Sequence, residues 1–142
     1  MEKTEKTALP QESRQSVMKT LGEYGCYFLS LVRLSEKIRG GRIDAVAAFV
    51  IALERKWADK DATMLDPAAI LSAMSGKRFS VRKEDAGYKA APNEYEVLLF
   101  TNGSYSHFVL GDGNGNVEYD PLGKSRSVAE GKITGKRIFA LA

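Results

Sequence analysis

Cysteine and histidine are the scarcest reactive residues of this chain. Its 142 residues include one cysteine, Cys26, and one histidine, His107. A single cysteine cannot form an internal disulfide and cannot by itself build a thiolate metal site, which excludes a disulfide scaffold and a zinc module. We therefore expect no metal or other cofactor, and any chemistry at Cys26 must be that of a thiol.

Long apolar runs and a secretory signal are also missing. The longest apolar stretches, residues 45–53 and 97–100, fall far short of the roughly 20 residues that a membrane-spanning helix needs. Residues 1–10 alternate Lys and Glu and lack the apolar centre of a signal peptide. We expect a soluble, cytoplasmic protein, although release by a non-classical route stays open. Residues 1–10 are predicted to be a flexible tail, and residues 11–142 a single domain.

Positive charge is modest and dispersed. The net charge is +3, and the basic residues are not massed in one run, which indicates a solvated surface rather than a nucleic-acid tract. Residues 77–83 carry four basic side chains, but these alternate with Phe79 and Val81 as on an edge strand. We expect no nucleic-acid partner.

The first half of the chain favours helices. Helical spacing of apolar residues predicts a leading helix over residues 11–21, a buried helix from Cys26 to the Gly40–Gly41 pair, and further helices over residues 43–57 and 66–74. Residues 23–25 are predicted to form a turn. Asp66 before Pro67 is typical of a helix N-terminus, and Gly76 of a helix end.

After Gly76 the pattern alternates as strands do. Apolar residues recur at every second position near residues 79–81, 95–99, 108–110 and 117–119, and residues 133–141 supply a final strand. The Asn102–Gly103 pair and the Gly-rich residues 111–116 predict turns; the latter lack the spaced carboxylates of a calcium loop. Helices followed by an antiparallel sheet indicate an α+β domain.

Three residues form a candidate catalytic group. Cys26 follows Gly25 and opens the most buried helix, where free N–H groups and the helix dipole lower a thiol pKa. His107 begins a strand that can lay its imidazole across that helix N-terminus. Asp120 ends the next strand, so the hairpin brings it beside His107 to orient the ring through its second nitrogen.

The segments GEYGCYFLSLVRL and SHFVLGDGNGNVEYDPLG resemble the papain-like cysteine peptidases, most closely the compact bacterial branch that cleaves double-glycine bacteriocin leaders. In that branch a Gly–Cys pair opens the central helix, a His starts a strand, and an Asp–Pro pair closes the partner strand, as at Cys26, His107 and Asp120. The resemblance implies a papain-like fold in a bacterial or phage setting. It also implies a peptide, isopeptide or peptidoglycan-like amide as substrate, cleaved through a thioester.

The oxyanion donor departs from the pattern of this family. The resembled peptidases place a Gln shortly before the nucleophile, whereas Thr20 stands there in this chain and the nearest Gln is Gln15. We predict that the Cys26 N–H supplies one donor and Gln15 the other, with Thr20 and Tyr24 as alternatives.

Hypotheses in which the protein has no catalytic activity stay open at this point. A lone Cys in an apolar helix is most often an inert buried residue, and a lone His is most often structural. The domain would then be a catalytically inactive papain-like fold that acts as a binding or structural module, for example in a phage. A third alternative is an inhibitor or regulator of a host enzyme.

Overall fold

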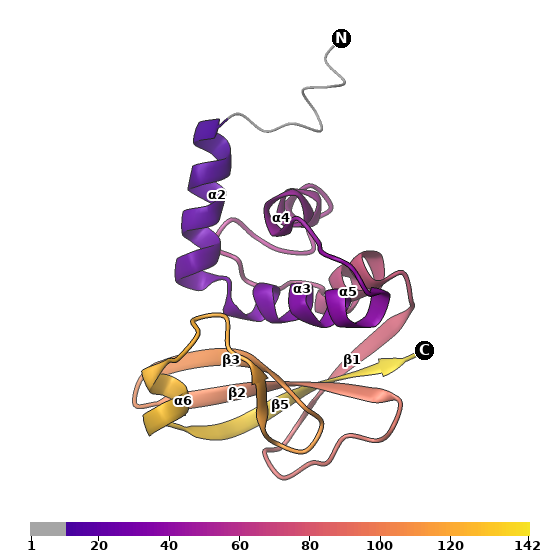
Figure 1. The fold of residues 1–142 in the computed structure, drawn as a ribbon, viewed down its shortest axis with the longest axis vertical. Coiled ribbons are helices and arrows are strands. Elements are labelled where there is room, and N and C mark those ends of the chain that lie inside the picture. Colours follow the sequence, from indigo (N-terminus) through magenta and orange to yellow (C-terminus); the bar gives the residue numbers. More distant parts are fainter. Residues whose placement is uncertain (1–10) are drawn as a thin grey trace.

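The computed structural model describes residues 11–142, and the tail predicted over residues 1–10 lies outside them. A layer of helices lies against a five-stranded sheet, with α3 next to the sheet and α4 farther from it (Figure 1). The helices of this layer are α2 (Gln11–Tyr24), α3 (Cys26–Arg39), α4 (Ala45–Glu54) and α5 (Pro67–Ser75). The predicted α+β class, with helices first and an antiparallel sheet after them, is confirmed.

Local capping signals account for the helix ends. The Asp44 carboxylate accepts hydrogen bonds from Val46 N and Ala47 N at the start of α4, and Asp66 accepts one from Ala69 N at the start of α5. Gly40 and Gly76 end α3 and α5 in the left-handed conformation, with φ of 77° and 79°.

Helix boundaries differ from the prediction by a few residues: the helix predicted over residues 43–57 is Ala45–Glu54, and the change at the end of α2 affects the site. The leading helix continues through residues 22–24, so the break before α3 is Gly25 alone. Gly25 N donates to Leu21 O (2.9 Å), and Gly25 O accepts from Leu29 N (2.7 Å), so both helices use this residue. A Cβ on Gly25 would lie 2.5 Å from Leu21 O, so only glycine fits between α2 and α3.

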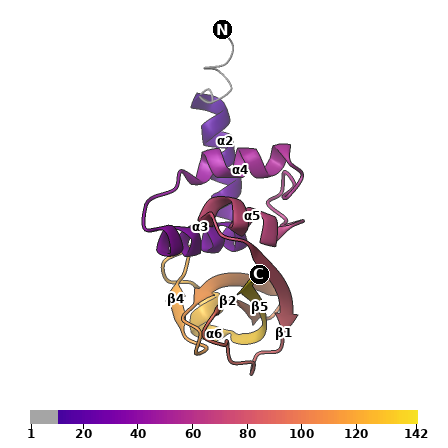
Figure 2. The same ribbon diagram turned by 90° about the vertical axis from the view of Figure 1, so that its right-hand side faces the viewer.

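The sheet has the order β1-β5-β2-β3-β4, and every neighbouring pair is antiparallel. The strands are β1 (Phe79–Glu84), β2 (Glu94–Asn102), β3 (Tyr105–Gly111), β4 (Val117–Tyr119) and β5 (Lys132–Leu141). A short helix, α6 (Arg126–Glu130), lies between β4 and β5 on the side of the sheet away from the other helices (Figures 1 and 2). We did not predict α6, because five residues are too few to show a helical period.

Both faces of the sheet are covered. The main core lies between the helices and one face, where Val97, Leu110 and Phe139 are buried. A smaller core on the other face consists of Leu98, Phe100 and Val109, against which Val128 of α6 and Ile133 pack. Strand β2 is therefore buried on both faces, which the simple alternation at residues 95–99 did not predict. No helix among residues 11–142 is long and apolar enough to cross a membrane.

Candidate active site

Cys26 is the first residue of α3 and lies at an open edge of the sheet. Strand β4 pairs with β3 only at Leu110 and Gly111, so it leaves the earlier part of β3 without a strand neighbour on that side. There the N–H of Phe108 donates to Cys26 Sγ over 3.4 Å. The thiol thus occupies a place where a strand edge and a helix N-terminus both leave backbone donors free.

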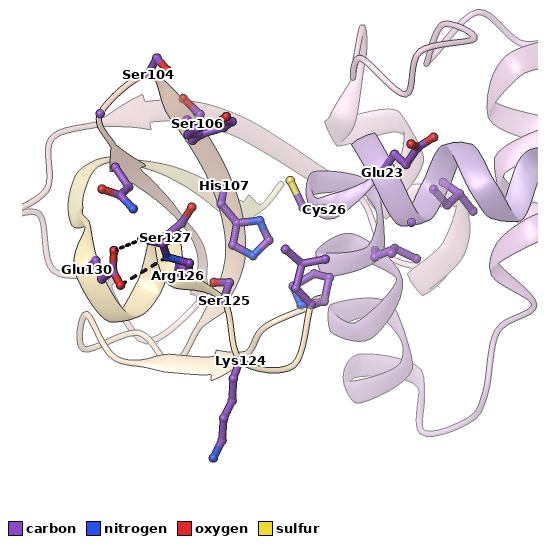
Figure 3. Close-up of a pocket in the computed structure, with 18 residues that line it drawn as sticks. Glu23, Cys26, Ser104, Ser106, His107, Lys124, Ser125, Arg126, Ser127 and Glu130 are labelled. Atoms are coloured by element: carbon purple, nitrogen blue, oxygen red, sulfur yellow. Dashed lines mark hydrogen bonds and ion pairs between the residues drawn. The ribbon is translucent and has the colours of Figure 1, made fainter.

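His107 lies between the thiol and the acidic member of the group. It is the third residue of β3 and is 4% exposed. Its Nε2 lies 2.6 Å from Asp120 Oδ1, so Nδ1 is the ring nitrogen that remains available to the Cys26 thiol. Figure 3 shows the Cys26 side chain and the His107 ring beside the same pocket.

Asp120 follows β4 and is itself held by two further hydrogen bonds. Leu122 N donates to its Oδ1 (2.9 Å), and the Ser125 hydroxyl donates to its Oδ2 (2.8 Å). Ser125 also caps α6 by accepting from Val128 N (3.3 Å). The Asp120 carboxylate therefore has a fixed orientation toward His107. Sequence reasoning missed Ser125, although a serine at a helix N-cap was a local signal that pointed to it.

The charges of the three side chains support one another. Burial opposes ionisation of Cys26, but its hydrogen bonds with His107 and with the Phe108 N–H lower the pKa of the thiol overall. Burial likewise disfavours a charged His107, but hydrogen bonds with Cys26 and Asp120 raise the pKa of the imidazole. The pKa of Asp120 is lowered, against its burial, by hydrogen bonds with His107, Leu122 and Ser125. A thiolate–imidazolium pair beside a carboxylate is the state these shifts favour.

The thiol is accessible from two pockets. The larger has a volume of about 890 Å³ and includes Cys26, Ser106, His107, Leu122 and Ser125 in its lining. The second has a volume of about 450 Å³ and lies on the side of Tyr24 and Met64, again with Cys26 in its wall. Both volumes are in the range of ligand-binding clefts, about 300–1,000 Å³. Cys26 therefore lines a cleft and is not sealed in the core.

The structure does not bring Gln15 to this cleft. Gln15 is exposed on α2 and lines neither pocket at Cys26. Of the alternatives, Thr20 also lines neither pocket, whereas Tyr24 lines the smaller one. The backbone N–H of Cys26 lies in the first turn of α3, where helix N–H groups have no partner within the helix.

The described part of the chain, residues 11–142, contains no group of three or more His, Cys, Asp or Glu side chains that could hold a metal ion. The cleft at Cys26 itself brings together a thiol, an imidazole and a carboxylate.

Fold and site together define an α+β domain with a Cys–His–Asp group at the junction of its helices and its sheet. The chain belongs to the family described as "Protein of unknown function, DUF261", whose model matches residues 9–141. No curated protein matches the chain, and no solved structure does. Because this family description states no activity, the function must be argued from the site.

Proposed function

We propose that this protein is a cysteine hydrolase that cleaves a peptide, isopeptide or peptidoglycan-like amide through a thioester. One observation carries the proposal: the only histidine of the chain lies 2.6 Å from Asp120 and lines the same cleft as the only cysteine, whose Sγ accepts a hydrogen bond from the next residue of the same strand, Phe108. A nucleophile next to a base, with the base oriented by a third group, is the arrangement that nucleophilic catalysis needs.

The reaction follows from this arrangement in two steps. The Cys26 thiolate attacks the carbonyl carbon, and as the C–S bond forms, the carbonyl π electrons move to the oxygen, which the Cys26 N–H stabilises. The tetrahedral intermediate collapses, the C–N bond breaks, and the imidazolium of His107 gives its proton to the departing nitrogen. Neutral His107 then takes a proton from water, which attacks the thioester and releases the acid and the Cys26 thiolate. Asp120 keeps the ring in place throughout.

The substrate class rests on the cleft and on the sequence resemblance. Pockets on both sides of Cys26 leave room for groups on each side of a scissile amide. The segments around Cys26, His107 and Asp120 resemble papain-like peptidases, which act on peptides and related amides. The likeness to the branch that cleaves double-glycine leaders is part of this proposal.

A second candidate is an inactive domain of the same fold that binds a peptide or peptidoglycan-like partner in this cleft. The position of Gln15 favours it, because that side chain cannot serve as the second oxyanion donor from outside the cleft. An enzyme with a single backbone donor would lack part of the usual transition-state stabilisation, in which one donor contributes about 10²–10³-fold in kcat.

The first experiment measures the rate of Cys26 alkylation by iodoacetamide against pH. We expect the parent to react well below the pH at which an unfolded control reacts, and His107→Ala to lose this advantage. Hydrolysis of a fluorogenic peptide library and of peptidoglycan fragments, with Cys26→Ala as control, then tests turnover. A low-pH thiolate without turnover of any amide would favour the binding module, and a thiol that reacts only when unfolded would refute both the ion pair and the hydrolase.

A further inference from the structure

A buried ion pair lies away from the cleft and has no part in the mechanism above. Glu96 on β2 is 0% exposed and Lys136 on β5 is 2% exposed, and Lys136 Nζ lies 3.0 Å from Glu96 Oε1. Removing two charges from water costs several kcal/mol per ion, and apolar residues of similar volume often stabilise a fold as well or better. Such a pair therefore calls for a role other than general stability.

Both members of the ion pair are also hydrogen-bonded to loops of the sheet. Glu96 Oε2 accepts hydrogen bonds from Gly113 N (2.8 Å) and Gly115 N (2.9 Å), both in the hairpin between β3 and β4. The Lys136 ammonium also donates to Tyr88 O (2.7 Å), in the loop between β1 and β2. One carboxylate thus fixes the hairpin to the centre of the sheet, and its counter-ion keeps that carboxylate in place.

The hairpin also fits closely over Glu96. Val97 pairs with Leu110, so the neighbouring Glu96 lies beside Gly111. A Cβ on Gly111 would lie 2.7 Å from both Cγ and Oε2 of Glu96, so this approach requires glycine. The β3–β4 register shifts between Leu110 and Gly111, which is where the chain leaves β3 to enter the hairpin.

This hairpin connects the strand of His107 to the strand that ends at Asp120. Because β4 has only three residues and pairs with β3 at two positions, strand pairing alone fixes it weakly. A second tie, from Lys37 of α3 to Glu118 of β4 (2.8 Å), is partly exposed, and exposed pairs contribute little. The Glu96 carboxylate is fully buried and accepts two hydrogen bonds from the hairpin, which are themselves partly buried, so it holds the hairpin more strongly than the exposed pair.

We propose that Glu96 is a positioning residue of the active site: by holding the Gly113–Gly115 turn, it sets where β4 ends and so places Asp120 against His107. The inference rests on the proposed function for its catalytic meaning, but the geometric effect on His107 can be measured without any substrate.

Glu96→Gln tests the inference, and Glu94→Gln is a matched control. Glu94 lies two residues earlier on the same strand and bonds Arg82, Tyr88 and Ala91 N, but no residue of the hairpin. Because the chain has one histidine, the ring resonances of His107 are unambiguous in an NMR titration. Both variants are made in the parent and in a Cys26→Ala background. In the latter the thiol is absent, so the effect of Asp120 on the pKa of His107 can be measured alone.

In the Cys26→Ala background, we expect Glu96→Gln to lower the pKa of His107 by about half a unit or more, because a displaced Asp120 no longer favours the imidazolium. Glu94→Gln should leave this pKa unchanged. In the parent background, Glu96→Gln should also raise the pH midpoint of Cys26 alkylation. A folded Glu96→Gln protein, checked by urea unfolding, whose His107 titrates as before would overturn the inference.

Two further outcomes keep the test decisive. If Glu96→Gln does not fold, Gly115→Ala replaces it as the test. The backbone φ of 86° at residue 115 disfavours alanine, so this substitution loosens the same turn. The same drop in the His107 pKa supports the inference, and an unchanged pKa overturns it. If the parent shows no low-pH thiolate but the His107 pKa falls in the Cys26→Ala background, the positioning role stands and the hydrolase proposal fails.

Discussion

Gly25 is the residue whose replacement should disturb the site most for the smallest chemical change. It joins α2 to α3 with φ of −94° and ψ of 17°, a conformation open to any residue, so Gly25→Ala introduces no intrinsic backbone strain. Its effect is steric alone. The new methyl group would lie 2.5 Å from Leu21 O, 2.7 Å from Leu21 Cα and 2.9 Å from Leu21 Cδ2.

The expected loss in free energy of unfolding follows from which atoms must move to make room for the methyl group. Two of these three contacts are to backbone, so α2 and α3 have to separate where they meet. Forcing an extra methyl into a packed position costs about 1–3 kcal/mol. Separation also lengthens the hydrogen bond from Gly25 N to Leu21 O, which contributes about 1 kcal/mol. We expect Gly25→Ala to lower the free energy of unfolding by about 2–4 kcal/mol.

Urea unfolding measures this change, and Gly22→Ala is the matched control. Gly22 lies inside α2, and nothing lies within 4 Å of a Cβ built on it. That substitution should raise the free energy of unfolding by up to about 1 kcal/mol, since alanine is the better helix former. In the folded fraction of Gly25→Ala, displacement of Cys26 from Phe108 N should also raise the alkylation midpoint. If both variants unfold alike, the close contact at Gly25 is not what positions α3.

Three further predictions concern the group of Cys26, His107 and Asp120. Asp120→Asn should raise the pH midpoint of Cys26 alkylation by roughly half to one unit, because the imidazolium loses its carboxylate partner. Ser125→Ala should shift this midpoint in the same direction but less, since Asp120 keeps its bond from Leu122 N; an equal shift would show that Ser125 is the main support. The pKa of His107 is raised on folding, so its protonation stabilises the fold. Urea unfolding of the parent and of His107→Ala gives the difference in their free energies of unfolding. This difference should be largest below about pH 6.5 and should fall as the pH rises through the pKa of His107 in the folded protein. A difference that grows with pH would contradict this expectation.

Much of the fold could be predicted because its signals are local. Asp66, Gly40 and Gly76 mark helix ends within one turn of themselves, and each does so in the structure. The change from helical to alternating periodicity marks the sheet without reference to distant residues. The five strands and the first four helices therefore follow from the sequence to within a few residues at each end.

What could not be predicted depends on contacts across the chain. The burial of Glu96 needs Lys136, forty residues later, and two glycine N–H groups of another loop, so nothing in its own segment distinguishes it from a surface glutamate. The prediction of Gln15 as an oxyanion donor required α2 to fold back over Cys26. Instead α2 continues to Tyr24, and Figure 1 shows that it runs from the start of α3 away from the sheet. Gln15 lies eleven residues before Cys26 and therefore lines neither pocket at the thiol.

The group of Cys26, His107 and Asp120 was easier to infer because each residue lies at or near the end of a helix or strand: Cys26 opens α3, His107 is the third residue of β3, and Asp120 directly follows β4. The N–H groups in the first turn of α3 have no partner four residues earlier, and Phe108 N has no strand partner on its free side. An anionic sulfur at Cys26 satisfies donors that the fold leaves open. A neutral, fully buried thiol would satisfy them poorly, because sulfur is a weak acceptor until it ionises. The same unpaired donors that mark the end of a strand ladder and the start of a helix therefore favour the anionic form of Cys26.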